Sequence, residues 1–154
     1  MKRIQTIIAL LLLTTCTAFA QSAEFNDQQL RLRRNISNWL RNEGFQPEID
    51  SDGDIKFKRE GTTYYVEVSK KDISPMYVSL SCYYRYNDDF PKWKIVDAMP
   101  SLSLWKAVKV AIYNENYAIS YQTYLPTTDP EAFTSIFYKI LGVMDGVADE
   151  IGEL

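Results

Sequence analysis

Histidine is absent from this chain of 154 residues. Its absence excludes serine or cysteine nucleophiles activated by histidine, and it excludes the usual histidine-containing zinc sites. Chemistry would then depend on carboxylates, tyrosines, lysines or a thiol. Nothing in the sequence pattern brings two carboxylates into one cleft, as glycoside hydrolysis requires. We therefore expect a protein that is not an enzyme, with no catalytic residue, no cofactor and no metal.

The chain also lacks an apolar run long enough to cross a bilayer, which needs about 20 residues. Its one pronounced run covers residues 4–13, after the basic pair Lys2 and Arg3 and before the small-x-small sequence Ala18-Phe19-Ala20. This arrangement is typical of a secretory signal peptide. We expect residues 1–20 to be removed by cleavage after Ala20. The mature protein should be periplasmic or secreted, with no membrane span.

Cysteine is scarce, with one residue at Cys16 and one at Cys82. Cys16 follows a segment that loosely resembles a lipoprotein processing site, but Thr15 stands where such sites usually have Gly, Ala or Ser. A lipid anchor at Cys16 is therefore the less favoured alternative to release after Ala20. Cleavage after Ala20 leaves Cys82 as the single thiol, so no disulfide can form within the mature chain. Strand alternation places that thiol on a core face.

Clustered basic charge is missing too, and the net charge is −3. Four arginines are spread along one predicted helix: Arg31, Arg33, Arg34 and Arg41. They do not form the concentrated basic patch that nucleic-acid binding needs, so we expect no nucleic-acid partner.

A short acidic segment has the spacing of the first half of a calcium loop, with aspartates at positions 50, 52 and 54. A complete loop needs glycine at its sixth place and glutamate at its twelfth. Those places hold Ile55 and Gly61. A solvated turn is therefore favoured over a calcium site.

Periodicity predicts an α+β domain. Leu32, Ile36 and Leu40 recur at helical spacing after a cap at Asn26 or Asp27. Further along, the pattern predicts strands over 54–58, 63–69, 76–85, 104–113 and 117–125, a short helix over 91–99, and a final helix over 128–151 that begins with a Thr128/Glu131 capping box. We expect an antiparallel five-stranded sheet with helices, in the order α-β-β-β-α-β-β-α. It would form a single domain over residues 26–154, after a flexible leader over 21–25.

The N-terminal half carries a set of turn glycines and apolar residues that recurs in one family: Trp39-Leu40, Gly44-Phe45, Asp52-Gly53-Asp54-Ile55, Phe57, Gly61 and Tyr64. With the Lys109-Val110 strand, the 117–125 strand and the helix bearing Phe133, Ile136, Phe137 and Leu141, the chain resembles the YbjN-like family, which shares the type III secretion chaperone-like fold. The resemblance implies an antiparallel sheet packed against helices, a tendency to dimerise, and binding of polypeptide rather than catalysis. It supplies no catalytic residues. Secretion chaperones of this fold act in the cytoplasm. The signal peptide predicted for this chain directs export, so the chain differs from them in this respect.

Tyrosine, in contrast, is abundant, with 11 residues beside 3 tryptophans. Strand alternation places five aromatic residues opposite the most aliphatic strand faces: Tyr65, Tyr77, Tyr83, Trp105 and Tyr113. On an uncovered sheet face they would form a patch of the kind enriched at interfaces. Under the first or last helix they would instead form a second side of the core. We expect a protein-binding domain that self-associates or binds an envelope client. The alternative is a small-ligand-binding or sensory module with an aromatic cleft between sheet and helices.

Overall fold

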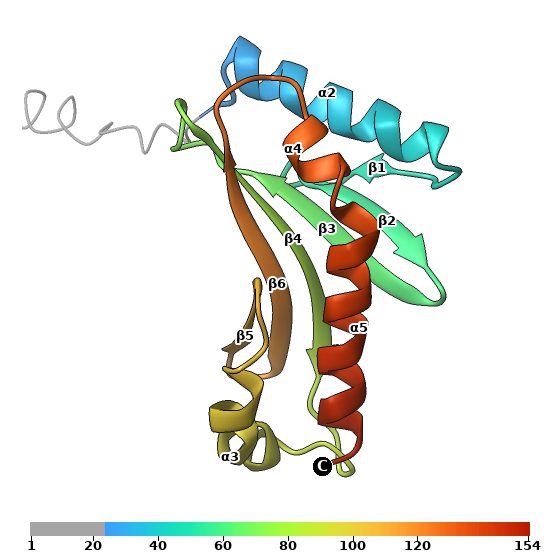
Figure 1. Cartoon of the computed structure of the whole chain (residues 1–154), viewed down its shortest axis with the longest axis vertical. Helices are drawn as coiled ribbons and strands as arrows, with labels where there is room; N and C mark the ends of the chain where they lie inside the picture. Colours follow the sequence, from blue (N-terminus) through green and yellow to red (C-terminus); the bar gives the residue numbers. More distant parts are fainter. Residues whose placement is uncertain (1–23) are drawn as a thin grey trace, which may run out of the picture.

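The computed structural model describes residues 24–154, which form one sheet with helices packed on it (Figure 1). In chain order the elements are α2 (Asp27–Asn42), β1 (Glu48–Ile49), β2 (Ile55–Arg59), β3 (Thr62–Val68), β4 (Met76–Arg85), α3 (Lys92–Leu102), β5 (Val108–Ile112), β6 (Asn116–Leu125), α4 (Glu131–Thr134) and α5 (Phe137–Gly152). All strand pairs are antiparallel, in the order β1-β2-β3-β4-β6-β5. The predicted α+β class with an antiparallel sheet is confirmed.

The strand number and the element order differ from the prediction. Within residues 24–154 the sheet has six strands rather than five, because Glu48 and Ile49 of β1 pair with β2. Two residues are too few to show an alternating pattern, so no periodicity indicates this edge strand. The observed order over the described residues is α-β-β-β-β-α-β-β-α-α.

The N-terminal half follows its local signals. Asn26 caps α2 in a capping box, since its side chain accepts from the Gln29 backbone and the Gln29 side chain accepts from the Asn26 backbone. Further on, β2 and β3 form a hairpin with a two-residue loop. Both loop residues, Glu60 and Gly61, have positive φ angles of 50° and 87°. This is the geometry of the type I′ turn, whose twist matches that of the strands.

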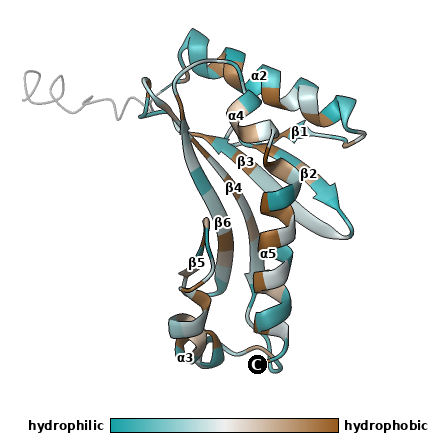
Figure 2. Ribbon diagram, in the orientation of Figure 1, coloured by the Kyte–Doolittle hydropathy of each residue, from teal (hydrophilic) through white to brown (hydrophobic). Residues whose placement is uncertain are grey.

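The sheet has two unlike faces. Val78, Leu80 and Cys82 of β4 are buried in one core cluster, together with the buried apolar residues of α2, α3, α4 and α5. Figure 2 shows apolar residues at regular intervals along α5, as expected of a helix with one buried side. The strand residues that alternate with the core residues point to the opposite face, which we call the open face. Within residues 24–154, no helix is packed on it, because the helices' buried apolar residues all join the core cluster.

The segment between β4 and β5 differs from the prediction. Helix α3 does not stop before Pro100 but continues to Leu102, and the strand predicted over 104–113 begins at Val108. Ile95 and Leu102 are both buried on α3, so tertiary packing holds the helix together past the proline. Pro100 leaves the carbonyl of Val96 without its helical partner, and Val96 is exposed, so water can satisfy that group.

The C-terminal helix is also different, since it is two helices. Ser135 and Ile136 separate α4 from α5, and Ile136 has the non-helical angles φ −111° and ψ 2°. Phe133 and Phe137 are buried on either side of this break, so the apolar stripe runs through it and conceals it in the sequence. The predicted Thr128/Glu131 capping box was wrong, because Pro130 holds the cap position. The Glu131 backbone donates instead to Asp129 Oδ1 at 3.0 Å.

Candidate functional site

Tyrosines gather in two groups on the open face. In the first group, the ring centres of Tyr65 and Tyr83 are 5.7 Å apart and those of Tyr83 and Tyr113 are 6.4 Å apart. In the second, Tyr77 and Tyr124 lie 5.4 Å apart in an edge-to-face arrangement. Tyr83, Tyr113 and Tyr124 are 50%, 49% and 57% exposed. The structure therefore brings together four of the five predicted site residues in two groups and adds Tyr124.

Small residues fill the space between the two tyrosine groups. Ser79, Ser81, Ala118 and Ser120 are buried although no described helix covers them, because their short side chains lie below their larger neighbours. The hydroxyls of Ser79 and Ser81 are 3.0 Å apart. Since Ser79 and Ser81 are two residues apart on β4, as are Ala118 and Ser120 on β6, this low floor extends about 7 Å along each strand at roughly 3.3 Å per residue.

Charge on the open face is divided between its two sides. On the β2–β3 side, Asp54 interacts electrostatically with Glu67. Burial, followed by repulsion from neighbouring acids, raises the pKa of Asp54 to about 6, against the attraction of Arg33. On the far side of the sheet, the Lys109 ammonium donates to Gln122 Oε1 at 2.6 Å. Glu67, Ser79 and Gln122 pair in one row across the strands, with Glu67 at one end. Lys109 pairs with Ser120 in the next row, and its ammonium reaches the other end of the first row at Gln122.

Trp105 is not part of this surface. It lies in the loop between α3 and β5, so the alternation that placed it with the tyrosines does not apply. Its indole N–H donates to Glu150 on α5, and its ring is so close to Gly146 that a Cβ there would lie 2.7 Å from it. Trp105 thus belongs to the covered side of the sheet.

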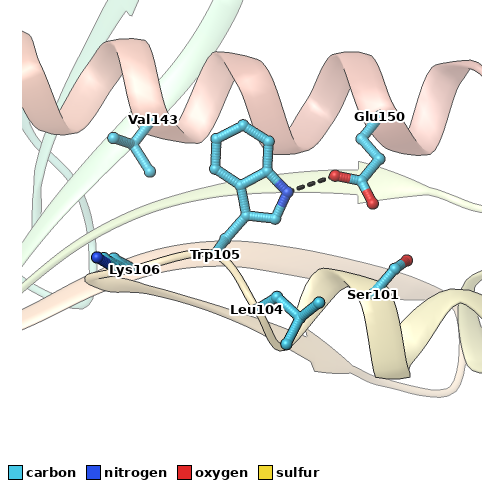
Figure 3. A pocket seen from close by; sticks show the side chains of 6 residues that line it. All are labelled: Ser101, Leu104, Trp105, Lys106, Val143 and Glu150. Atoms are coloured by element: carbon cyan, nitrogen blue, oxygen red, sulfur yellow. Dashed lines mark hydrogen bonds between the residues drawn. The ribbon is translucent and has the colours of Figure 1, made fainter.

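A cavity of about 460 Å³ adjoins the Trp105 indole (Figure 3). Its lining comes from α3, the following loop and α5: Ser101, Leu104, Trp105, Lys106, Val143 and Glu150. The apolar surfaces of Trp105 and Leu104 could hold an apolar group. The Glu150 carboxylate already accepts the indole N–H, so its remaining oxygen is the one free to bind a donor.

Another cavity, of about 430 Å³ and with a polar lining, lies beside Asp145 of α5. Asp145 accepts from Arg59 at 2.7 Å and from the Tyr64 hydroxyl at 3.0 Å, one bond to each carboxylate oxygen. Burial, with the neighbouring carboxylate, raises the pKa of Tyr64, and the hydrogen bond to Asp145 raises the pKa of Arg59. Because both oxygens of Asp145 are already bonded, this cluster joins α5 to the β2–β3 hairpin rather than presenting a free reactive group.

The other two candidate sites serve local structure. Asp50 Oδ1 accepts from the backbone of Asp52, Gly53 and Asp54, so the acidic segment forms a side-chain-capped turn. Cys82 is buried, and burial raises its pKa to about 11. Among residues 24–154, no group of three or more Cys, Asp and Glu side chains has an arrangement that could hold a metal ion.

Sequence reasoning missed two surfaces. The small-residue floor had a signal, since Ser79, Ser81 and Ser120 alternate with apolar residues. The outer side of α3 also had a signal in the sequence. Trp93, Val96 and Leu104 stand at helical spacing opposite the buried residues of this helix. Within the described part of the chain, no helix has both the length and the apolar content needed to cross a bilayer.

Comparison with known proteins shows the fold alone. No protein-family model matches the chain, and no curated protein is significantly similar to it. Among solved structures, the chain is similar to the crystal structure of an uncharacterized protein from Methanothermobacter thermautotrophicus, with a TM-score of 0.50 and 12% sequence identity. The match covers 79% of this chain and 99% of the other. The two proteins share an α+β architecture.

Proposed function

We propose that this protein is a non-enzymatic binding domain whose open face binds another protein, and that its first partner is a second copy of the chain. The observation that carries the proposal is the composition of that face, with two exposed tyrosine groups beside a floor of small residues. Tyrosine supplies rigid contact area at low entropic cost, and serine supplies adaptable hydrogen bonds. Such a face offers contact area to another protein, since its tyrosines come from neighbouring strands of one sheet.

The strand register suits a symmetric partner at the row of Tyr83. A two-fold axis parallel to the strands, between β4 and β6, would lay β4 of one copy over β6 of the other. Tyr83 is paired in register with Ala118, so the axis would set Tyr83 against the partner's Ala118, a large side chain against a small one. Sheets packed face to face lie about 10 Å apart, which leaves room for this interdigitation.

The charges support the same axis. It would lay β3 of one copy over β5 of the other, because these strands lie at equal distances on either side of the β4–β6 boundary. Glu67 would then face the partner's Lys109, whose ammonium already extends toward Gln122 in the same row. Because the axis repeats each contact, the dimer would contain this pair twice.

Charge reversal tests the arrangement. We expect Glu67→Lys and Lys109→Glu each to weaken dimerisation by about tenfold, since each sets like charges against each other. Combining the two reversals should restore the dimer, because opposite charges face each other again. Sedimentation equilibrium of the purified protein measures the dissociation constants, and Lys139→Glu on the exposed side of α5 is the matched control.

Two results would contradict the dimer. One is a double reversal weaker than both single variants, which would mean that Glu67 and Lys109 do not face each other. The other is a wild-type protein that stays monomeric at every concentration. In that case, an affinity pull-down from envelope extract, with Tyr83→Ser as the control bait, tests an envelope client on the same face. Equal recovery by both baits would exclude the open face as the binding surface.

We also propose that the chain is exported and acts in the periplasm or outside the cell as a YbjN-like domain. The basic pair, apolar run and small-x-small sequence of residues 1–20 support export, although this segment lies outside the described residues. The intact mass of the protein recovered from the envelope tests the proposal. A chain beginning at Gln21 agrees with release after Ala20, whereas a lipidated chain beginning at Cys16 would replace release by anchoring.

A second candidate function is binding of a small ligand in the cavity beside Trp105. The observation that favours it is the exposed apolar lining from Trp105 and Leu104 with a polar group at Glu150. Val143→Phe would enlarge a side chain of α5 that lines this cavity without touching the open face. A ligand of this cavity should lose affinity for that variant, whereas protein binding by the open face should stay unchanged.

A further inference from the structure

Helix α3 is apolar on two opposite sides. Its inner side contributes Ile95, Ala98 and Leu102 to the core. Its outer side carries Trp93 and Val96, which are 62% and 46% exposed. A helix on the surface of a globular domain normally has a polar outer side. The outer side of α3 therefore has the composition of a surface that is covered by something else.

The apolar side continues beyond the end of the helix. Leu104 is 80% exposed and lies in the turn held by the hydrogen bond from its backbone N–H to the Ser101 carbonyl. Trp93, Val96, Pro100 and Leu104 follow one another at intervals of three, four and four residues, which is the spacing of one side of a helix. We call Trp93, Val96 and Leu104 the α3 stripe. Exposed apolar residues standing singly are normal, but three in a row along a helix and the turn that follows it are not.

Lysines flank the α3 stripe. Lys92 and Lys94 stand beside Trp93 on opposite sides of the helix, and Lys106 follows Leu104. Lys92 and Lys106 are exposed, while the Lys94 ammonium donates to the Asp89 carbonyl at 3.2 Å. Asp97 is the acid on the outer side of α3. An apolar centre with tryptophan, bordered by long cationic side chains, is the pattern of a helix that lies in a membrane interface.

The place of α3 in the molecule suits contact with an extended surface. Figure 1 shows α3 at one end of the long axis, with the C-terminus at the same end. The C-terminal Leu154 is itself 44% exposed. With 11 residues, α3 is about 16 Å long at 1.5 Å per residue, which is too short to span a bilayer but sufficient to lie along one.

We propose that the α3 stripe docks the protein on the surface of a bilayer that contains anionic lipid. Trp93, Val96 and Leu104 enter the boundary between headgroups and acyl chains, where the indole has both an apolar and a polar surrounding. The lysines reach the lipid phosphates, and their stems cover apolar surface. The open face lies on the sheet and not on α3, so it stays available to a protein partner while the stripe is docked. The proposal is thus independent of the dimer.

Flotation with lipid vesicles tests the proposal. The protein purified from the expressing cell is mixed with vesicles of phosphatidylcholine alone or with added phosphatidylglycerol. We expect binding that increases with phosphatidylglycerol and decreases with salt. Trp93→Ser with Leu104→Ser should weaken binding by about tenfold or more, because two inserted side chains are lost. The matched control is Leu30→Ser with Ile49→Ser, which replaces two exposed apolar residues on α2 and β1. All variants share one N-terminus, so any contribution from it cancels.

Fluorescence locates the contact. Brominated lipid quenches a tryptophan that enters the acyl boundary, and the quenched signal should disappear in Trp93→Phe while Trp39 and Trp105 remain. Circular dichroism confirms that each variant is folded. Equal binding by the stripe variant and the control would overturn the proposal, as would a wild type that binds no vesicle. Binding that is indifferent to phosphatidylglycerol and salt would overturn the role of the lysines.

Discussion

Replacement of Phe137 by alanine should remove much of the protein's stability. Phe137 is the first residue of α5 and is buried where α2, α4, α5 and the sheet meet. Its ring centre is 4.9 Å from that of Trp39, 5.8 Å from that of Phe57 and 5.8 Å from that of Phe133. Truncation of a buried phenylalanine costs about 3–5 kcal/mol. Edge-to-face contacts of about 0.5–1.5 kcal/mol each place Phe137 in the upper part of that range.

The expected loss is a large part of the total free energy of unfolding. A domain of this size is stable by about 5–15 kcal/mol, so Phe137→Ala should unfold at a much lower urea concentration with an unchanged m-value. Circular dichroism during urea unfolding measures both quantities. Phe137→Leu keeps most of the apolar volume and should cost clearly less. A loss below about 2 kcal/mol for alanine, with the m-value unchanged, would contradict the tight packing inferred for this ring.

Two further predictions concern titratable groups. Asp54 has a folded pKa of about 6, above its ordinary value of 3.8. Above pH 6 the charged carboxylate therefore destabilises the folded protein. This destabilisation disappears as the pH falls through 6 toward 3.8. Asp54→Asn should therefore raise the melting temperature at pH 7.5 and raise it less at pH 5; a gain independent of pH would contradict the shift. Cys82 is 1% exposed with a pKa of about 11, so a thiol reagent at pH 8 should react with it far more slowly than with a free thiol, because the protein must first open. Fast labelling of the native protein would contradict its burial.

The sequence predicted most of the fold because its local signals agree with its tertiary packing. The cap at Asn26 and the alternation along β4 are both local features, and the structure contains each of them. The errors occur where packing prevails over local preference. Leu102 is held in the core, so α3 continues through Pro100 and delays the start of β5. Because β5 begins only at Val108, Trp105 lies outside the strand, and its predicted place among the tyrosines was wrong.

Alternation shows which residues share a face but not whether the face is covered. The polarity of the residues between the tyrosines could have decided this. Ser79, Ser81 and Ser120 are largely buried between their neighbours, and a helix over the open face would remove the remaining access of their hydroxyls to water, so that each would need a hydrogen-bond partner. Ser79 and Ser81 can bond to each other, but one hydroxyl hydrogen remains unsatisfied by that bond. A sheet face with a serine floor is therefore poorly suited to a covering helix. It is better suited to a partner that brings its own hydroxyls, as a second copy of this face does.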